Sequence, residues 1–369
     1  MLTIVHTENS CGWGGQELRT LTEMQGMLER GHHLTLVCPR EAQIHDAALA
    51  RGIPTTALAI TRKKPSSIMA LRSWLAGQGP IDILNCHSST DSWLSALACA
   101  TLRKAPVLVR TRHVSTPVAN NWTSRWLYRS ATRHIITTGE ALRQQLHVDN
   151  GVPLAQMTSI PTGIDLTRFQ PMNKAEARAR LGLPADKHYL GILATLRNWK
   201  GHTYLLDAFA QLRDAFPDWN LLLVGDGPQR QNLERKAEAL GLRQRITMPG
   251  NRDDVPIWLN AMDLFTLPSY GNEGVPQGIM QAMACGLSVI STPVGAIREA
   301  VIDNQTGLIV PPQNTEALSQ ALRTLMRDAA LRSHFAQAGL NRARERFGSE
   351  VMLDKVEAVY AQVLAEHAG

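Results

Sequence analysis

The alternation of short apolar runs with amphipathic stretches is the feature that most limits how this chain can fold. In the first half, runs that suit one buried strand recur between stretches with helical spacing. Such alternation is typical of α/β proteins, in which a parallel, doubly wound sheet is joined by helical crossovers. We expect the strands of this half at residues 2–6, 34–38, 81–85, 107–111 and 134–138.

The same pattern starts again after a break rich in Pro and Gly at residues 161–171. A chain of 369 residues is also long for a single hydrophobic core. We therefore predict two Rossmann-like domains, at residues 1–168 and 169–348. The strands of the second domain are expected at residues 189–194, 221–224, 264–267, 289–291 and 308–310.

The tail of the chain, residues 349–369, follows a point at which the second sheet should be complete. Its apolar residues recur with helical spacing, at Val351, Val356, Val359 and Val363. We expect one helix here, packing back across the hinge between the domains.

The excess of basic residues lies in the first half. Up to residue 170 the chain has 17 Lys and Arg against 11 Asp and Glu, and beyond it 21 against 21. Groups such as Arg62-Lys63-Lys64 and Arg103-Lys104 suit either an anionic membrane surface or plain solvent. No apolar run approaches the roughly 20 residues that span a bilayer, and no basic segment precedes the first strand. We expect a cytoplasmic protein, with or without contact to the inner face of the membrane.

Metal and disulfide chemistry have little support in the sequence. The five cysteines are odd in number and form no C-x-x-C pair, which argues against a zinc site or a disulfide framework. Asp253 and Asp254 are adjacent, so they do not form a D-x-D pair, and we expect them to cap a helix.

A glycine-rich loop follows the first expected strand. Gly14 and Gly15 precede the first helical stretch, where a backbone without side chains can approach an anion at a helix start. This loop is a candidate diphosphate contact. A tight turn without any ligand explains it equally well.

The segment from Ser269 to Gly286 is the strongest candidate for a ligand site. It follows an apolar strand and opens a helix, with Pro276 suited to the first helical turn. Backbone N–H groups at a helix start bind phosphate, and an acid just before them can accept hydrogen bonds from sugar hydroxyls. The alternative is an ordinary strand, loop and helix. The candidate ligand-binding residues here are Glu273, Gly274, Val275, Pro276, Gln277 and Gln281.

Two histidines follow strands of the first half, His87 and His113. The carboxyl ends of parallel strands form the edge of the sheet where ligands bind, so either side chain could meet a substrate. A purely structural hydrogen bond is the alternative for each.

Several ordered motifs together resemble one known family. The chain is similar to the retaining GT-B glycosyltransferases commonly called family 4, which include lipopolysaccharide and mannosyl transferases. The motifs run through the whole chain: Gly14-Gly15-Gln16-Glu17, Ile160-Pro161-Thr162-Gly163-Ile164-Asp165, Trp199-Lys200-Gly201, Val224-Gly225-Asp226-Gly227-Pro228, the segment around Glu273, Ser291-Thr292-Pro293-Val294-Gly295 and Thr306-Gly307-Leu308-Ile309-Val310.

This resemblance implies two facing Rossmann-like domains and transfer of a sugar from a nucleotide diphosphate donor. It implies an envelope glycan or a lipid-linked molecule as acceptor, in lipopolysaccharide or polysaccharide synthesis. No cofactor or metal ion and no nucleic acid partner are expected. Fixed cations can stabilise a diphosphate leaving group without a metal.

The resemblance also assigns roles to individual residues. Lys200 and Arg197 would hold the diphosphate, Glu273 would contact the transferred sugar, and His113 would lie near the reacting groups. Gly250 and Asn251 would lie near the nucleotide base, and Gln281 near the ribose. The chain departs from the family pattern at two positions: Thr195 stands where an arginine is usual, and Gln281 where a second glutamate is usual.

Two other functions remain open at this point. A nucleotide-sugar epimerase of the same architecture would need paired acid and base groups around one sugar carbon, and no convincing carboxylate pair is visible. A catalytically silent nucleotide-sugar binding module is suggested by the departures at Thr195 and Gln281.

Overall fold

The computed structural model describes residues 1–114, 116–271 and 273–368. The chain divides into two units, Met1–Gly163 with Ser349–Gly369, and Ile164–Gly348. The second unit begins five residues before the predicted position, because Ile164 N–H donates a 2.7 Å hydrogen bond to the carbonyl of Phe347 within that unit.

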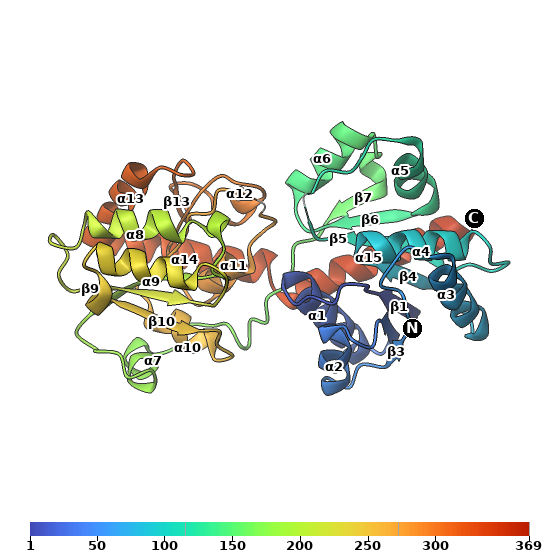
Figure 1. The fold of residues 1–369 in the computed structure, drawn as a ribbon, viewed down its shortest axis with the longest axis horizontal. Helices are drawn as coiled ribbons and strands as arrows, with labels where there is room; N and C mark the ends of the chain where they lie inside the picture. The colour runs from blue at the N-terminus through green and yellow to red at the C-terminus, as the bar shows by residue number, and fades with distance from the viewer. Residues whose placement is uncertain (115, 272, 369) are drawn as a thin grey trace. The chain divides into compact units, whose positions relative to one another are not determined.

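The first unit contains a parallel sheet in the order β3-β2-β1-β4-β5-β6-β7 (Figure 1). The chain extends this sheet first to one side of β1 and then to the other, so the order reverses between β1 and β4. Such a switch point is where α/β sheets bind ligands, beyond the carboxyl ends of the strands. The strands are β1 (Thr3–Thr7), β2 (His33–Cys38), β3 (Thr55–Ala57), β4 (Ile83–Cys86), β5 (Val107–Arg112), β6 (His134–Thr137) and β7 (Met157–Ser159).

Helices connect these strands, and separate apolar clusters lie on the two faces of the sheet. The helices are α1 (Gly15–Glu29), α2 (Gln43–Ala50), α3 (Pro65–Gly77), α4 (Ser89–Cys99), α5 (Trp122–Trp126), the π-helical turn η1 (Leu127–Ala131), α6 (Glu140–Asn150) and the 3-10 turn η2 (Leu154–Gln156).

The second unit contains a parallel sheet in the order β10-β9-β8-β11-β12-β13, which reverses between β8 and β11. Its strands are β8 (His188–Leu193), β9 (Trp219–Val224), β10 (Ile246–Gly250), β11 (Leu264–Leu267), β12 (Val289–Ser291) and β13 (Gly307–Ile309). Its helices are α7 (Lys174–Arg180), η3 (Asn198–Lys200), α8 (His202–Ala210), α9 (Arg230–Ala239), η4 (Arg243–Arg245), α10 (Val255–Ala261), α11 (Gln277–Ala284), α12 (Ile297–Ala300), α13 (Thr315–Arg327) and α14 (Ala329–Arg346).

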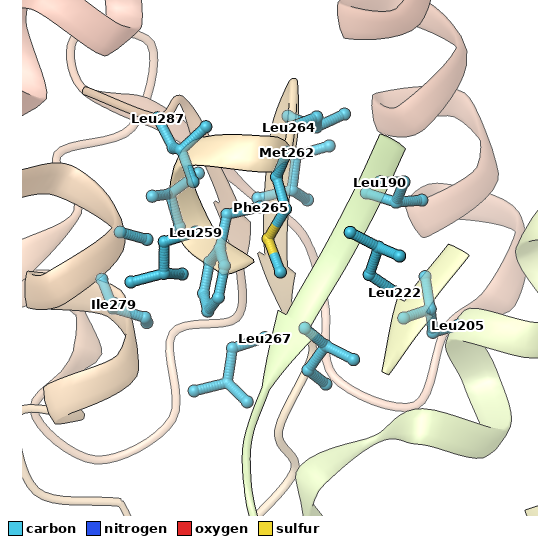
Figure 2. Close-up of a cluster of buried hydrophobic side chains, with 14 of the residues drawn as sticks. Leu190, Leu205, Leu222, Leu259, Met262, Leu264, Phe265, Leu267, Ile279 and Leu287 are labelled. Carbon is cyan, nitrogen blue, oxygen red and sulfur yellow. The ribbon is translucent and has the colours of Figure 1, made fainter. Parts of the chain in front are cut away.

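The core of the second unit is packed tightly around β8 and β11 (Figure 2). Met262 and Phe265 are fully buried in it. A side chain at Gly191 would bring Cβ within 2.1 Å of the Met262 sulfur, so glycine is what allows Met262 to lie across β8. Truncating a core aromatic residue such as Phe265 to alanine typically costs about 3 to 5 kcal/mol.

The last helix, α15 (Ser349–Ala368), belongs to the first unit and packs on α1 (Figure 1). Leu353 lies against Gly26, where a Cβ would approach it to 2.3 Å. Arg30 pairs with Glu350 at 2.6 Å and with Glu357 at 2.5 Å. The buried residues of this helix that belong to the hydrophobic core are Met352, Leu353, Val356, Val359, Tyr360 and Val363.

Sequence reasoning missed three strands, β3, β7 and β10. Each is at the edge of its sheet and is largely half-buried, so none carries a continuous apolar run.

The prediction that Asp254 caps α10 is confirmed for its position and wrong for its side-chain hydrogen bond. Asp254 stands at the N-cap position, but its side chain accepts from Arg252 and Trp258 and makes no capping bond.

Candidate active site

A buried ion pair lies at the switch point of the second sheet. Lys200 follows β8 and Glu273 follows β11, and the Lys200 Nζ donates to Glu273 Oε1 at 2.7 Å. The Ser269 hydroxyl donates to the same oxygen at 2.7 Å. The Glu273 side chain is only 5% exposed and that of Lys200 is 20% exposed. Lys200 is therefore held in place and is not a freely solvated loop lysine.

Glycines allow the loops that carry this pair to approach each other closely. Gly201 has φ +80°, and a Cβ there would lie 2.0 Å from the carbonyl oxygen of Pro268. Tyr270 N–H donates to the carbonyl of Trp199 at 2.8 Å, which joins the two loops directly. Gly295 has φ +58°, and a Cβ there would lie 1.9 Å from the carbonyl oxygen of Glu273. The position of Glu273 thus depends on backbone contacts from two neighbouring loops.

The helix start predicted to bind phosphate lies at the same edge. A Cβ at Gly278 would lie 2.7 Å from the carbonyl oxygen of Leu193, so α11 begins directly against the end of β8. Pro276 was expected inside the first helical turn, but it is the N-cap residue and α11 begins at Gln277. The cause is the extended conformation of Pro276, with ψ 126°. Asn272 of this segment lies outside the described residues.

Other predicted binding residues also lie in the second unit. Gly274 and Gln281 are half-buried, and Val275 is buried. Gly250 is buried with φ +80° and accepts a hydrogen bond from Gly225 N–H at 3.0 Å, whereas Asn251 is exposed.

Arg197 is placed differently from Lys200. Its side chain is exposed, and the guanidinium carbon lies 5.2 Å from the centre of the Trp199 ring, in a cation–π contact. Thr195 is exposed in the same loop. The structure therefore brings Lys200 and Glu273 together and leaves Arg197 on the surface nearby.

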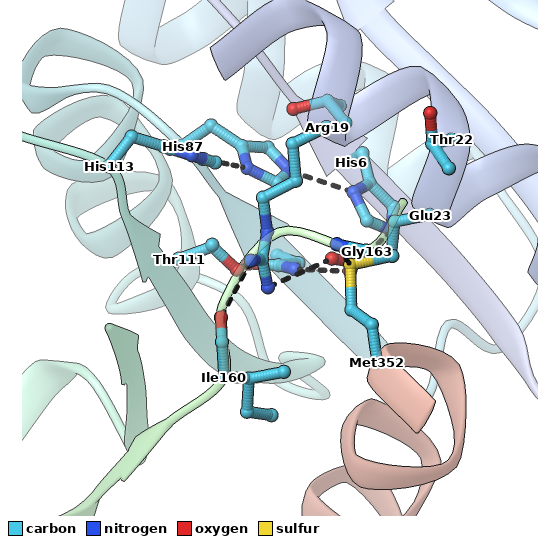
Figure 3. A network of polar contacts seen from close by, with 12 residues as sticks. His6, Arg19, Thr22, Glu23, His87, Thr111, His113, Ile160, Gly163 and Met352 are labelled. Carbon is cyan, nitrogen blue, oxygen red and sulfur yellow. Dashed lines mark hydrogen bonds and ion pairs between the residues drawn. The ribbon is translucent and has the colours of Figure 1, made fainter. Parts of the chain in front are cut away.

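In the first unit, the predicted histidines are hydrogen-bonded to each other (Figure 3). His87 Nδ1 lies 3.0 Å from His113 Nε2. His87 Nε2 lies 2.8 Å from Nδ1 of His6, a strand residue that sequence reasoning missed. Burial lowers the pKa of His6 to about 3, and it lowers the pKa values of His87 and His113 well below their usual range. These imidazoles are neutral at physiological pH.

The glycine-rich loop follows β1, at the point where the strand order of the first sheet reverses between β1 and β4. Gly14 is the N-cap of α1 in an extended conformation, and Gly15 is the first helical residue. A Cβ at Gly14 would lie 3.7 Å from the nearest atom, so neighbouring protein groups leave room for a larger side chain at this position.

Two buried carboxyl groups near the end of β1 were also missed. Burial and the nearby Asp91 raise the pKa of Glu8 to about 8, against the hydrogen bonds that Glu8 accepts from Ser10 N–H and Gln16. Asp91 accepts from the backbone N–H groups of His87 and Ser88 and caps α4. The pair is invisible in the sequence because its members come from segments 83 residues apart.

The described residues contain no candidate metal cluster and no candidate membrane span. In that part of the chain, no group of three or more His, Cys, Asp or Glu side chains is arranged to hold a metal ion. Across the same residues, no helix combines the length and the apolar character needed to cross a bilayer.

Models of known families match both units. The model described as Glycosyltransferase Family 4 matches residues 13–168, and the one described as Glycosyl transferases group 1 matches residues 173–342. The chain is 32% identical over 249 residues to the lipopolysaccharide core biosynthesis mannosyltransferase LpsB of Rhizobium meliloti, covering 65% of this chain and 68% of that protein. The chain belongs to the family 4 glycosyltransferases. The resemblance in the sequence motifs is thereby confirmed.

Further comparisons extend over nearly the full length of this glycosyltransferase. It is 26% identical to the phosphatidyl-myo-inositol mannosyltransferase of Mycobacterium leprae, over 95% of this chain and 93% of that protein. The crystal structure of Anabaena HepE in complex with UDP has a TM-score of 0.84 at 20% identity, covering 98% of this chain and all of that one. These likenesses agree with the GT-B fold expected from the sequence.

Proposed function

We propose that this glycosyltransferase moves a sugar, with retention of anomeric configuration, from a nucleotide diphosphate donor to an envelope glycan or lipid-linked acceptor. The observation that carries the proposal is the Lys200–Glu273 pair at the switch point of the second sheet, beside the start of α11. Ligands of α/β sheets bind at this edge, and phosphate binds at helix starts.

The pair supplies the two kinds of group that such a donor needs. The Lys200 ammonium would stabilise the charge that grows on the departing diphosphate, which is a transition-state effect. Glu273 would accept hydrogen bonds from hydroxyls of the transferred sugar. The acceptor hydroxyl would attack on the face that the diphosphate leaves, with the departing phosphate taking its proton.

The relatives support the proposed substrates. HepE was crystallised with UDP, and LpsB is named for lipopolysaccharide core biosynthesis. The Mycobacterium leprae relative is named for a phosphatidyl-myo-inositol acceptor.

The test is a panel of UDP-, GDP- and ADP-sugars incubated with and without acceptor extract. Thermal shift narrows the base first, since a ligand at 100 times its dissociation constant stabilises the folded state by about 2.7 kcal/mol. We expect nucleotide diphosphate release that depends on acceptor, and a product whose anomeric NMR coupling matches the donor. A donor converted to its epimer without acceptor would identify an epimerase, and binding without turnover would identify a silent module.

We also expect transfer to continue in excess EDTA, because Lys200 and the helix start provide positive charge at the diphosphate. The measurement is the initial transfer rate before and after chelation. A rate abolished by EDTA and restored by Mg²⁺ or Mn²⁺ would contradict the proposed metal-independent mechanism.

A further inference from the structure

Three imidazoles form a line near the carboxyl ends of the neighbouring strands β1, β4 and β5 (Figure 3). His6 Nδ1 lies 2.8 Å from His87 Nε2, and His87 Nδ1 lies 3.0 Å from His113 Nε2. His87 therefore uses one ring nitrogen for each neighbour. The planes of the first two rings differ by only 16°, so that hydrogen bond lies close to both ring planes. His6 and His87 are buried and His113 is half-buried.

Neutral imidazoles in a line can place their protons in only two ways. Each neutral ring has one nitrogen that donates and one that accepts. Because each contact joins an Nδ1 to an Nε2, all three rings carry the proton on Nε2 or all three carry it on Nδ1. The nearby cations Arg19 and Arg110 lower the pKa of His113 further, after burial, and so oppose an extra proton. The choice between the two forms is made at the ends of the line.

At the inner end, His6 Nε2 faces a carboxylate. Glu23 Oε1 lies 4.0 Å from this nitrogen. The same oxygen accepts from the Tyr360 hydroxyl at 3.2 Å and from Asn85 Nδ2 at 3.4 Å. The Asn85 amide is oriented by its own oxygen, which accepts from Thr111 at 3.1 Å. Glu23 Oε1 is thus a hydrogen-bond acceptor for both of these neighbours.

Arg19 gives this carboxylate a counter-charge. Its Nη2 lies 3.7 Å from Glu23 Oε2, and both side chains are fully buried. Its Nη1 donates to the carbonyl of Ile160 at 2.6 Å, which holds the guanidinium in place. Burial raises the pKa of Glu23 on balance, and Arg19 with the two hydrogen bonds offsets part of that rise in favour of the carboxylate. A carboxylate facing His6 Nε2 favours the proton on that nitrogen.

We propose that the Arg19–Glu23 ion pair holds His6, His87 and His113 in the Nε2–H form, so that His113 offers an unprotonated Nδ1 to a sugar hydroxyl. Glu23, His6 and His87 are positioning residues, since they act only through His113. The opposite form would present an N–H donor at the same place and would favour a ligand oxygen without a proton. The statement about the sugar hydroxyl rests on the proposed function, whereas the form of the rings does not.

The experiment is NMR of the ring nitrogens in the full-length protein labelled with ¹⁵N-histidine. Two-bond correlations distinguish the Nε2–H from the Nδ1–H form, and single His→Gln variants assign the signals. We expect all three rings in the Nε2–H form, unchanged across about pH 5 to 8. His113 or His87 in the Nδ1–H form would overturn the proposal. The ring forms are read from the wild-type spectrum, and the variants serve only to assign its signals.

Glu23→Gln tests where the preference originates. Removing the charge should give His6 and His113 a new Nδ1–H population together, although His113 is two hydrogen bonds away from His6. A change at His6 with none at His113 would overturn the coupling. His134 is the internal control, because it is buried in the same sheet but bonds Thr158 at 2.9 Å and lies outside the line. If no nucleotide sugar supports transfer, the proposed function fails while these spectra stay as expected, so the two ideas fail separately.

Discussion

The Lys200–Glu273 pair shows how two opposite charges are kept in place within the second unit. An ammonium bonded to a carboxylate at 2.7 Å in a mostly buried position has little freedom, so its position does not have to be organised when the substrate arrives. Ser269 supplies a second donor to the same oxygen, which helps to keep the carboxylate oriented beside Lys200.

We predict that Lys200→Ala lowers the transfer rate by about two to three orders of magnitude. Loss of one preorganised charge contact to a leaving group typically raises the activation free energy by about 3 to 4 kcal/mol. The measurement is the initial rate with saturating donor, alongside circular dichroism to verify folding. Lys187→Ala is the matched control, because Lys187 also pairs with a carboxylate at 2.7 Å but lies at the exposed Asp218. A folded Lys200→Ala protein with a near-normal rate would eliminate the phosphate-binding role.

Burial of Glu8 makes the stability of the folded protein depend on pH. Its folded-state pKa is raised to about 8 from 4.5, chiefly by burial, so the folded protein binds a proton that the unfolded chain releases. The stability from this proton is complete below about pH 4.5 and is lost as the pH rises through about 8. Glu8→Gln should therefore gain melting temperature relative to wild type between about pH 5 and about pH 9.

Thermal denaturation of both proteins across that range is the measurement. The neutral buried His6 produces an opposite trend below about pH 6.5, but it is present in both proteins and cancels in their difference. Glu41→Gln, at an exposed glutamate, should show no such gain. A constant difference between wild type and Glu8→Gln at all pH values would mean that Glu8 is ionised throughout.

Sequence reasoning located residues that sit in motifs and missed those that become important only by burial. Lys200 and Glu273 could be found because each lies in a recognisable segment after a strand. His6 and Glu23 could not, because the groups that they contact come from segments distant in the chain. The one available signal was the four-residue spacing of Arg19 and Glu23 on a helix with apolar neighbours.

At the scale of elements, backbone contacts between loops decide where the site residues lie. Gly201 and Gly295 have left-handed backbones, and each has a carbonyl oxygen where its Cβ would be. Central strands could be predicted because they are buried on both faces and read as apolar runs. The loop contacts and the edge strands β3, β7 and β10 could not, since they depend on which distant segment lies alongside.

We predict that Gly295→Ala lowers both stability and transfer, because the new Cβ would lie 1.9 Å from the carbonyl of Glu273 and must displace it. Gly182→Ala is the matched control, with a similar φ of +65° but no atom within 4 Å of the Cβ. The strain of the backbone alone should cost about 1 to 2 kcal/mol in either variant. Urea denaturation and transfer rates measure the difference, and equal effects in the two variants would show that the overlap at Glu273 relaxes freely.

At the scale of the whole molecule, two basic groups of the first unit, residues 62–64 and 103–104, lie apart from each other. Lys63, just before α3, donates to Ser89 at the start of α4 at 3.5 Å. Arg72, later in α3, donates to Thr101 just beyond the end of α4 at 3.1 Å. The two helices therefore run in the same direction. The basic group before α3 and the one after α4 lie at opposite ends of this helix pair.

We predict salt-sensitive binding to vesicles that contain anionic lipid, lost when Arg62, Lys63, Lys64, Arg103 and Lys104 are all changed to glutamine. Each basic residue near such a surface contributes about 1 kcal/mol, and screening over a Debye length of roughly 8 Å weakens the attraction as salt rises.

Because the two groups lie at opposite ends of α3 and α4, a membrane should engage one of them more strongly, so changing residues 62–64 alone and 103–104 alone should have unequal effects. Arg180, Arg235 and Arg243 of the second unit, also exposed, provide a control with the same charge change as residues 62–64. Vesicle co-sedimentation is the measurement. Equal recovery with neutral and anionic vesicles would leave the basic half of the chain as an ordinary solvated surface.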